Sequence, residues 1–169
     1  MEIERKYLLT EKQLSRLIPN KNDFILETRY YLYCKNDTEI RFTKRGIESF
    51  TLDRMEILHN DTEEYFVRRK QRINLTEDEF ETLLSVVGTQ KPVQRLHFKL
   101  NDQIELKVYQ GRHDGLIRAE VEFNSIEEAN HHTPTFKHSG EITNTPIGRD
   151  VLLAHLNEDE MKQLLTFRS

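Results

Sequence analysis

The sequence predicts an α+β fold: an antiparallel β-barrel of about eight strands around a polar interior, with short helices packed outside. One observation is that several segments alternate between an apolar face and a face of mixed charge, the period of a strand. Another is that three short segments begin with a capping box and carry apolar residues at helical spacing, so they need an apolar surface to cover. A sheet with helices on its apolar face and charges on the other closes around a polar lumen. We treat residues 1–169 as one domain.

The composition argues against two classes of partner. Charged residues make up 32% of the chain, the net charge is −4 and the isoelectric point is about 6.0. Proteins that bind nucleic acid usually present a basic face, so we do not expect nucleic acid as a partner. There is no signal peptide and no apolar run long enough to span a membrane, so we expect no membrane partner. A single cysteine, Cys34, favours a reducing, cytoplasmic location.

The first half of the chain predicts one short helix among four strands. Residues 1–7 alternate as a strand, and Thr10 then opens a capping box for the helix. Residues 24–33 and 39–45 are rich in β-formers and flank a polar turn, which predicts a hairpin. Residues 49–55 follow as a further strand.

The second half predicts four strands, with one helix after the first of them and further helices towards the C-terminus. Residues 63–75 predict a charged strand, and a capping box at Thr76 starts a helix that ends at Gly88. Three further strands are predicted over residues 95–100, 103–109 and 117–123. A third capping box at Ser125 starts a short helix, residues 131–140 form a polar loop, and helices begin at Asp150 and Asn157.

The charged faces of these strands carry the chemistry. The Glu-x-Glu pairs, Glu2 with Glu4 and Glu120 with Glu122, would bring four carboxylates into one lumen, where they repel unless cations neutralise them. Carboxylate oxygens are ligands for hard ions such as Mg²⁺. Basic side chains on the same faces suit a ligand with several phosphates; they are Lys6, Arg41, Arg45, Arg95 and Arg118. The alternative is a set of surface ion pairs on open sheets.

These motifs resemble the CYTH superfamily, the triphosphate tunnel metalloenzymes. The resemblance rests on Glu2-Ile3-Glu4-Arg5-Lys6, the strand with Arg41, the helix from Thr76 to Val87 and Glu120-Val121-Glu122, and it covers nearly the whole chain. It implies an eight-stranded antiparallel tunnel that acts on a triphosphate with Mg²⁺ or Mn²⁺. Members include inorganic, thiamine and RNA triphosphatases and class IV adenylyl cyclases. The four glutamates would hold the metal, and the five basic residues would bind phosphate.

The sequence also departs from the pattern of this superfamily. Five positions carry an unexpected residue: Thr43, Asp53, Val93, Lys107 and Thr145. Arg68 and Lys70 stand where a Glu-x-Glu pair is usual, and Asp53 is expected to form an ion pair with one of them. No residue that orients the attacking water is identified.

Three hypotheses follow. The leading one is a metal-dependent phosphohydrolase acting on inorganic triphosphate or on a nucleoside or organic triphosphate. The second is a catalytically degenerate tunnel that binds nucleotide or polyphosphate, favoured by Asp53 and Val93 in place of lysines. The third is a class IV type adenylyl cyclase, for which the sequence offers no adenine pocket. The substrate and the oligomeric state, including a homodimer, stay open.

Overall fold

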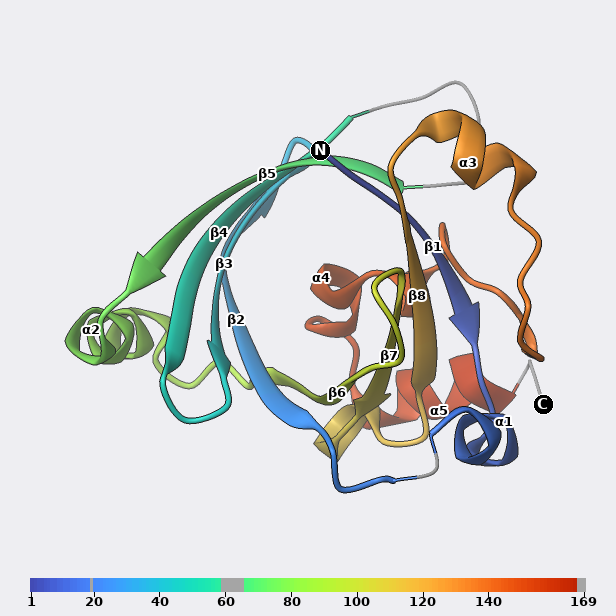
Figure 1. Ribbon diagram of the computed structural model, residues 1–169. Helices are drawn as coiled ribbons and strands as arrows, with labels where there is room; N and C mark the ends of the chain where they lie inside the picture. Colours follow the sequence, from blue (N-terminus) through green and yellow to red (C-terminus); the bar gives the residue numbers. More distant parts are fainter. Residues whose placement is uncertain (19, 59–65, 167–169) are drawn as a thin grey trace.

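In the part of the chain that the structure describes, nine antiparallel strands form one sheet, and eight of them close into a barrel. The computed structural model describes residues 1–18, 20–58 and 66–166. The strands are β1 (Glu2–Leu8), β2 (Ile25–Lys35), β3 (Thr38–Arg45), β4 (Ser49–Ile57), β5 (Phe66–Leu75), β6 (Val93–Lys99), β7 (Ile104–Tyr109), β8 (Ile117–Phe123) and β9 (Gly140–Glu141). Their order is β5-β4-β3-β2-β6-β7-β8-β1-β9, and a further pairing of β5 with β1 closes the ring (Figure 1). The predicted eight-stranded barrel is therefore confirmed.

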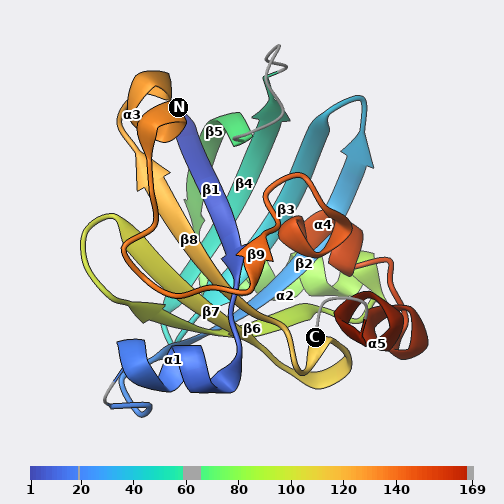
Figure 2. The same cartoon turned by 90° about the vertical axis from the view of Figure 1, so that its right-hand side faces the viewer.

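Short helices lie outside the ring or at its end. They are α1 (Glu11–Leu17), α2 (Glu77–Val87), α3 (Ile126–His131), α4 (Asp150–Leu153) and α5 (Glu158–Thr166), with 3₁₀ turns η1 (Gly111–His113) and η2 (Pro146–Gly148). The capping boxes at Thr10 and Thr76 have both of their reciprocal hydrogen bonds. The box at Ser125 is half formed, because the Glu128 carboxylate accepts from the backbone N–H of Asn124 instead. Figure 2 shows the same helices from the side of the barrel.

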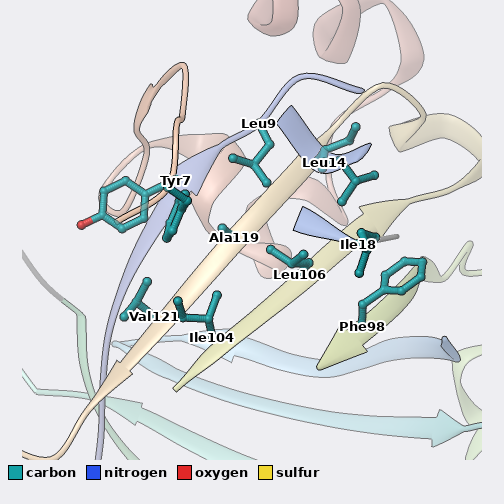
Figure 3. Packing of buried hydrophobic residues seen from close by; sticks show 11 residues of the cluster. Tyr7, Leu9, Leu14, Ile18, Phe98, Ile104, Leu106, Ala119 and Val121 are labelled. Carbon is teal, nitrogen blue, oxygen red and sulfur yellow. The ribbon is translucent and has the colours of Figure 1, made fainter. Parts of the chain in front are cut away.

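The apolar core lies between the helices and the outer faces of the strands. One cluster joins α1 to β1, β7 and β8 and includes Leu14, Leu106 and Ala119 (Figure 3). A second lies under α2, where Phe80 packs on Phe42 of β3. Burial of such side chains stabilises the fold by about 2 kcal/mol each. Because the apolar faces are covered outside, the charged faces point inward.

The C-terminal segment covers one end of the barrel. Ile147, Val151 and Leu153 form a buried cluster with Tyr109, the last residue of β7. Gly148 is required in this segment, since a Cβ atom there would lie 2.0 Å from the carbonyl oxygen of Ile142. The segment is thereby fixed with α4 at the end of the lumen, inside the ring of strands in Figure 1.

Most predicted boundaries agree with the structure to within two residues. The polar turn between β2 and β3 is formed by Asn36 and Asp37, both with positive φ, as a tight hairpin requires. The prediction missed β9, which pairs with β1 at the edge of the expected polar loop. Residues 63–65 of the predicted strand 63–75 lie outside the described residues. Within the described residues, none of the helices has the length and apolar character needed to cross a membrane.

Candidate functional site

The inside of the barrel is a cavity lined almost entirely by charged side chains. In the described part of the chain, eleven lysines and arginines and eight carboxylates line it, a formal charge of +3. The whole chain carries −4, so positive charge is concentrated inside the barrel. Such a lumen attracts anions, because its walls focus the field of the cations.

All the residues that the sequence singled out reach this one cavity. They are Glu2, Glu4, Lys6, Arg41, Arg45, Arg95, Arg118, Glu120 and Glu122. The register of β1 against β8 places Glu4 opposite Glu122 and Lys6 opposite Glu120, so the two Glu-x-Glu pairs are adjacent. The shared cavity excludes the alternative of ion pairs on open sheets. The roles assigned to the individual residues stay predictions.

Glu2 and Glu4 are neutralised by basic residues of β5. Lys70 Nζ lies 2.6 Å from Glu2 Oε1, and Arg68 Nη2 lies 3.2 Å from Glu2 Oε2 and also donates to Glu4. Lys6 Nζ lies 3.0 Å from Glu4 Oε1. Burial alone would raise the pKa of Glu4, but Arg68 and Lys6 lower it to about 2. Glu4 is therefore a carboxylate held in ion pairs.

The two glutamates of the second Glu-x-Glu pair, Glu120 and Glu122, lie in different surroundings. Glu120 is buried between Lys107, which donates to it, and Arg118, whose Nη2 lies 2.5 Å from Glu120 Oε1. Glu122 is more exposed, and its carboxylate forms no hydrogen bond or ion pair within the described residues. Burial and the nearby glutamates Glu105 and Glu4 raise the pKa of Glu122. Lys107, noted as a departure in the sequence, is thus the counter-ion of Glu120.

Asp150 joins three arginines at the covered end of the cavity. Its carboxylate lies 2.6 Å from Arg29 Nη1 and 2.8 Å from Arg118 Nη2, and it also accepts from Arg95. The Tyr109 hydroxyl donates to it at 2.6 Å. Although burial would raise the pKa of Asp150, the three guanidinium groups hold it well below its usual range. Asp150 and the three guanidinium groups thus form one buried ion-pair cluster.

Arg41 is bound much more loosely than the other buried arginines of the cavity. Its side chain is 94% buried, yet its nearest anionic atoms are Asp53 Oδ2 at 3.7 Å and Glu39 Oε2 at 3.8 Å. No described residue forms a hydrogen bond with Arg41. Asp53 instead pairs with Arg72, Nε to Oδ1 at 2.6 Å and Nη2 to Oδ2 at 2.9 Å. The prediction that Asp53 pairs with Arg68 or Lys70 was wrong. The β4–β5 register places Arg72, and neither of these residues, opposite Asp53.

Several residues that line the cavity were not predicted from the sequence. Glu27 lies opposite Arg45 on β3 and opposite Arg95 on β6, and it pairs with both, at 2.7 Å to Arg45 Nε and 2.6 Å to Arg95 Nε. The alternation of Glu27 and Arg29 along β2 was a usable signal. Asp150 gave no such signal, because its position depends on how the C-terminal segment packs.

The four glutamates do not fit a divalent ion in their present arrangement. A metal site needs several carboxylate oxygens that are free to converge, whereas Glu2, Glu4 and Glu120 are each occupied by cationic side chains. Among the described residues no group of three or more acidic, histidine or cysteine side chains is placed to hold a metal. Glu122 alone has carboxylate oxygens without such a partner within that part of the chain.

Comparisons with known proteins show the fold. No protein-family model matches the chain, and no curated protein matches it. The crystal structure of the inorganic triphosphatase NE1496 is similar, with a TM-score of 0.57 and 24% identity over 91% of this chain and 94% of that one. The putative adenylyl cyclase HpAC1 from Hippeastrum, whose structure is described as revealing a dominant triphosphatase activity, has a TM-score of 0.53 and 13% identity. That match covers 77% of this chain and 83% of HpAC1.

Proposed function

We propose that this chain, which has the fold of the triphosphate tunnel proteins, binds the phosphate chain of a small-molecule triphosphate in its tunnel and hydrolyses it. The observation that carries the proposal is Arg41, a buried guanidinium on the tunnel wall without a hydrogen bond to any described residue. Burying such a group without a hydrogen bond costs free energy unless a ligand satisfies it, and its ion pairs with Asp53 and Glu39 are long, at 3.7 Å and 3.8 Å. A phosphate oxygen is the partner whose geometry suits a guanidinium.

The reaction that fits this lining is attack of water on a terminal phosphorus atom. The bond from that phosphorus to the bridging oxygen breaks, so inorganic triphosphate and water give diphosphate and orthophosphate. Charge spreads over the phosphoryl oxygens in the transition state, and fixed guanidinium groups stabilise it. Arg41 binds the phosphate chain in this proposal, and Arg95 and Arg118 hold it once it displaces Asp150. No residue is assigned to the attacking water.

The lining favours a phosphate chain over a nucleobase as the recognised group. Apart from His97, no described residue that lines the cavity is aromatic, so no ring is available to stack on a base. This argues against adenylyl cyclase activity and favours inorganic triphosphate as substrate. The triphosphatase activities named for NE1496 and HpAC1 support the same choice. A cytoplasmic location and a homodimer stay predictions.

Binding without turnover is a second candidate, and one observation favours it. Glu2, Glu4 and Glu120 are neutralised by neighbouring cations and are poor acceptors for a proton from water. Asp53 is engaged by Arg72 and sits where the superfamily pattern leads us to expect a lysine. A tunnel can hold a polyphosphate with these residues in place and still lack transition-state charge stabilisation.

The two candidates are separated by measuring binding and turnover on one preparation. Calorimetry gives the affinity for inorganic triphosphate, ATP and thiamine triphosphate, and phosphate release from each is followed with and without Mg²⁺ or Mn²⁺. We expect inorganic triphosphate to bind and to be hydrolysed, and the Arg41→Met variant to bind it more weakly and hydrolyse it more slowly. Binding without phosphate release favours the second candidate. If none of the three compounds binds in any buffer, both candidates fail.

A further inference from the structure

We infer that the side chains of Arg68 and Lys70 take the place of a divalent cation in this tunnel, so that triphosphate binds without Mg²⁺ or Mn²⁺. The inference rests on the proposed function, because it concerns how the same ligand is held. It departs from the metal dependence that the superfamily resemblance implies for Glu2 and Glu4.

The strand register brings these two cations to the glutamates. Glu2 lies directly opposite Arg68 in the antiparallel pairing of β1 with β5. Residues two apart on a strand share a face, so Lys70 projects into the same cavity as Arg68. The Arg68 guanidinium bridges Glu2 and Glu4, and Lys70 pairs with Glu2 at 2.6 Å. One guanidinium and one ammonium thus join two carboxylates, as a bound cation would.

Charge in this part of the tunnel is already balanced. Five carboxylates on β1, β7 and β8 face five cationic side chains within the described residues. The carboxylates are Glu2, Glu4, Glu105, Glu120 and Glu122, and the cations are Lys6, Arg68, Lys70, Lys107 and Arg118. A site that depends on a divalent ion carries excess negative charge without it. Here the excess is absent, and a further divalent ion would lie beside Arg68 and Lys70 and be repelled.

The cations that remain are enough to hold an anion directly. Arg41 has no hydrogen-bond partner among the described residues, and the cavity as a whole has an excess of positive charge. Guanidinium and phosphate form charge-assisted hydrogen bonds without a bridging metal. Because the glutamates are neutralised by side chains of the protein, they do not repel the phosphate chain.

The first test measures triphosphate binding to the wild-type protein by calorimetry, once with EDTA and once with Mg²⁺. We expect the affinity in EDTA to equal or exceed the affinity in Mg²⁺, because Mg²⁺ also complexes free triphosphate. An affinity that is about tenfold or more weaker in EDTA overturns the inference and leaves the proposed function standing. Absence of binding in both buffers overturns the inference and the proposed function together.

The second test restores a Glu-x-Glu pair on β5 with the variant Arg68→Glu/Lys70→Glu. We expect this variant to bind Mn²⁺, measured by electron paramagnetic resonance, where the wild-type protein does not. Its melting temperature should rise when Mn²⁺ is added, and its triphosphate binding should require the metal. The matched control is Arg69→Glu on the outer face of the same strand, where the side chain is 62% exposed. Mn²⁺ binding by the wild-type protein equal to that of the double variant contradicts the inference.

Discussion

Replacing Arg41 by methionine separates ligand binding from stability. The substitution keeps an unbranched apolar stem and removes the guanidinium. In the wild-type protein this group lies 3.7 Å from Asp53 and 3.8 Å from Glu39, beyond hydrogen-bond distance. Asp53 keeps both of its hydrogen bonds with Arg72 in the variant. We therefore expect the free energy of unfolding to change by less than about 1 kcal/mol, since an unsatisfied buried charge is removed.

The loss in affinity is expected to be much larger. A hydrogen bond to a charged group contributes about 1.5–3 kcal/mol. Its loss corresponds to a roughly tenfold to 150-fold larger dissociation constant for triphosphate. Calorimetry measures the affinity, and thermal unfolding without ligand measures stability. The matched control is Arg54→Met on β4, whose side chain is 44% exposed and which does not line the cavity. The control should leave both quantities unchanged.

Either of two results would refute a direct role of Arg41 in binding triphosphate. If Arg41→Met binds triphosphate as tightly as the wild-type protein, the guanidinium does not contact the ligand. If the variant instead loses several kcal/mol of stability, Arg41 is a structural residue, and its effect on binding is indirect.

Three further predictions concern ion pairs inside the tunnel. Asp150→Asn should destabilise the protein by about 3 kcal/mol, because three buried arginines lose a counter-ion that they share. Saturating triphosphate should then raise the melting temperature of this variant more than that of the wild-type protein. Asp53→Lys should cost about 3 kcal/mol in thermal unfolding, and adding Arg72→Glu should recover most of it; no recovery would show that the pair is not structural. The pKa of Glu4 is lowered from 4.5 to about 2, so the unfolded chain binds more protons between these pH values and stability falls as the pH drops through this window. Glu4→Gln should therefore lose less stability than the wild-type protein between pH 5 and pH 3, measured by urea unfolding, and an equal loss would contradict that pKa.

Alternation along the strands was sufficient to predict the faces of the barrel. Glu2, Glu4 and Lys6 share the inner face, and the intervening Ile3 is buried outside it, because successive side chains on a strand point to opposite sides. The polar pattern could not predict which charges pair. That depends on register between strands, which placed Asp53 opposite Arg72 and not beside Arg68 or Lys70.

Asp150 shows what the sequence could not reveal. It begins a four-residue helix C-terminal to all eight barrel strands, and nothing in its sequence neighbours predicts a position among three arginines. The position follows from the packing of Ile147 and Val151 at the end of the barrel and from Gly148, whose place no larger residue can fill.

The crystal structure of the protein with inorganic triphosphate, grown in EDTA, tests the central claim most directly. We predict the phosphate chain inside the tunnel, with an oxygen within hydrogen-bond distance of the Arg41 guanidinium. Arg68 and Lys70 should still be paired to Glu2 and Glu4. An empty tunnel at saturating triphosphate, or a phosphate chain bound only on the outer surface, would contradict it.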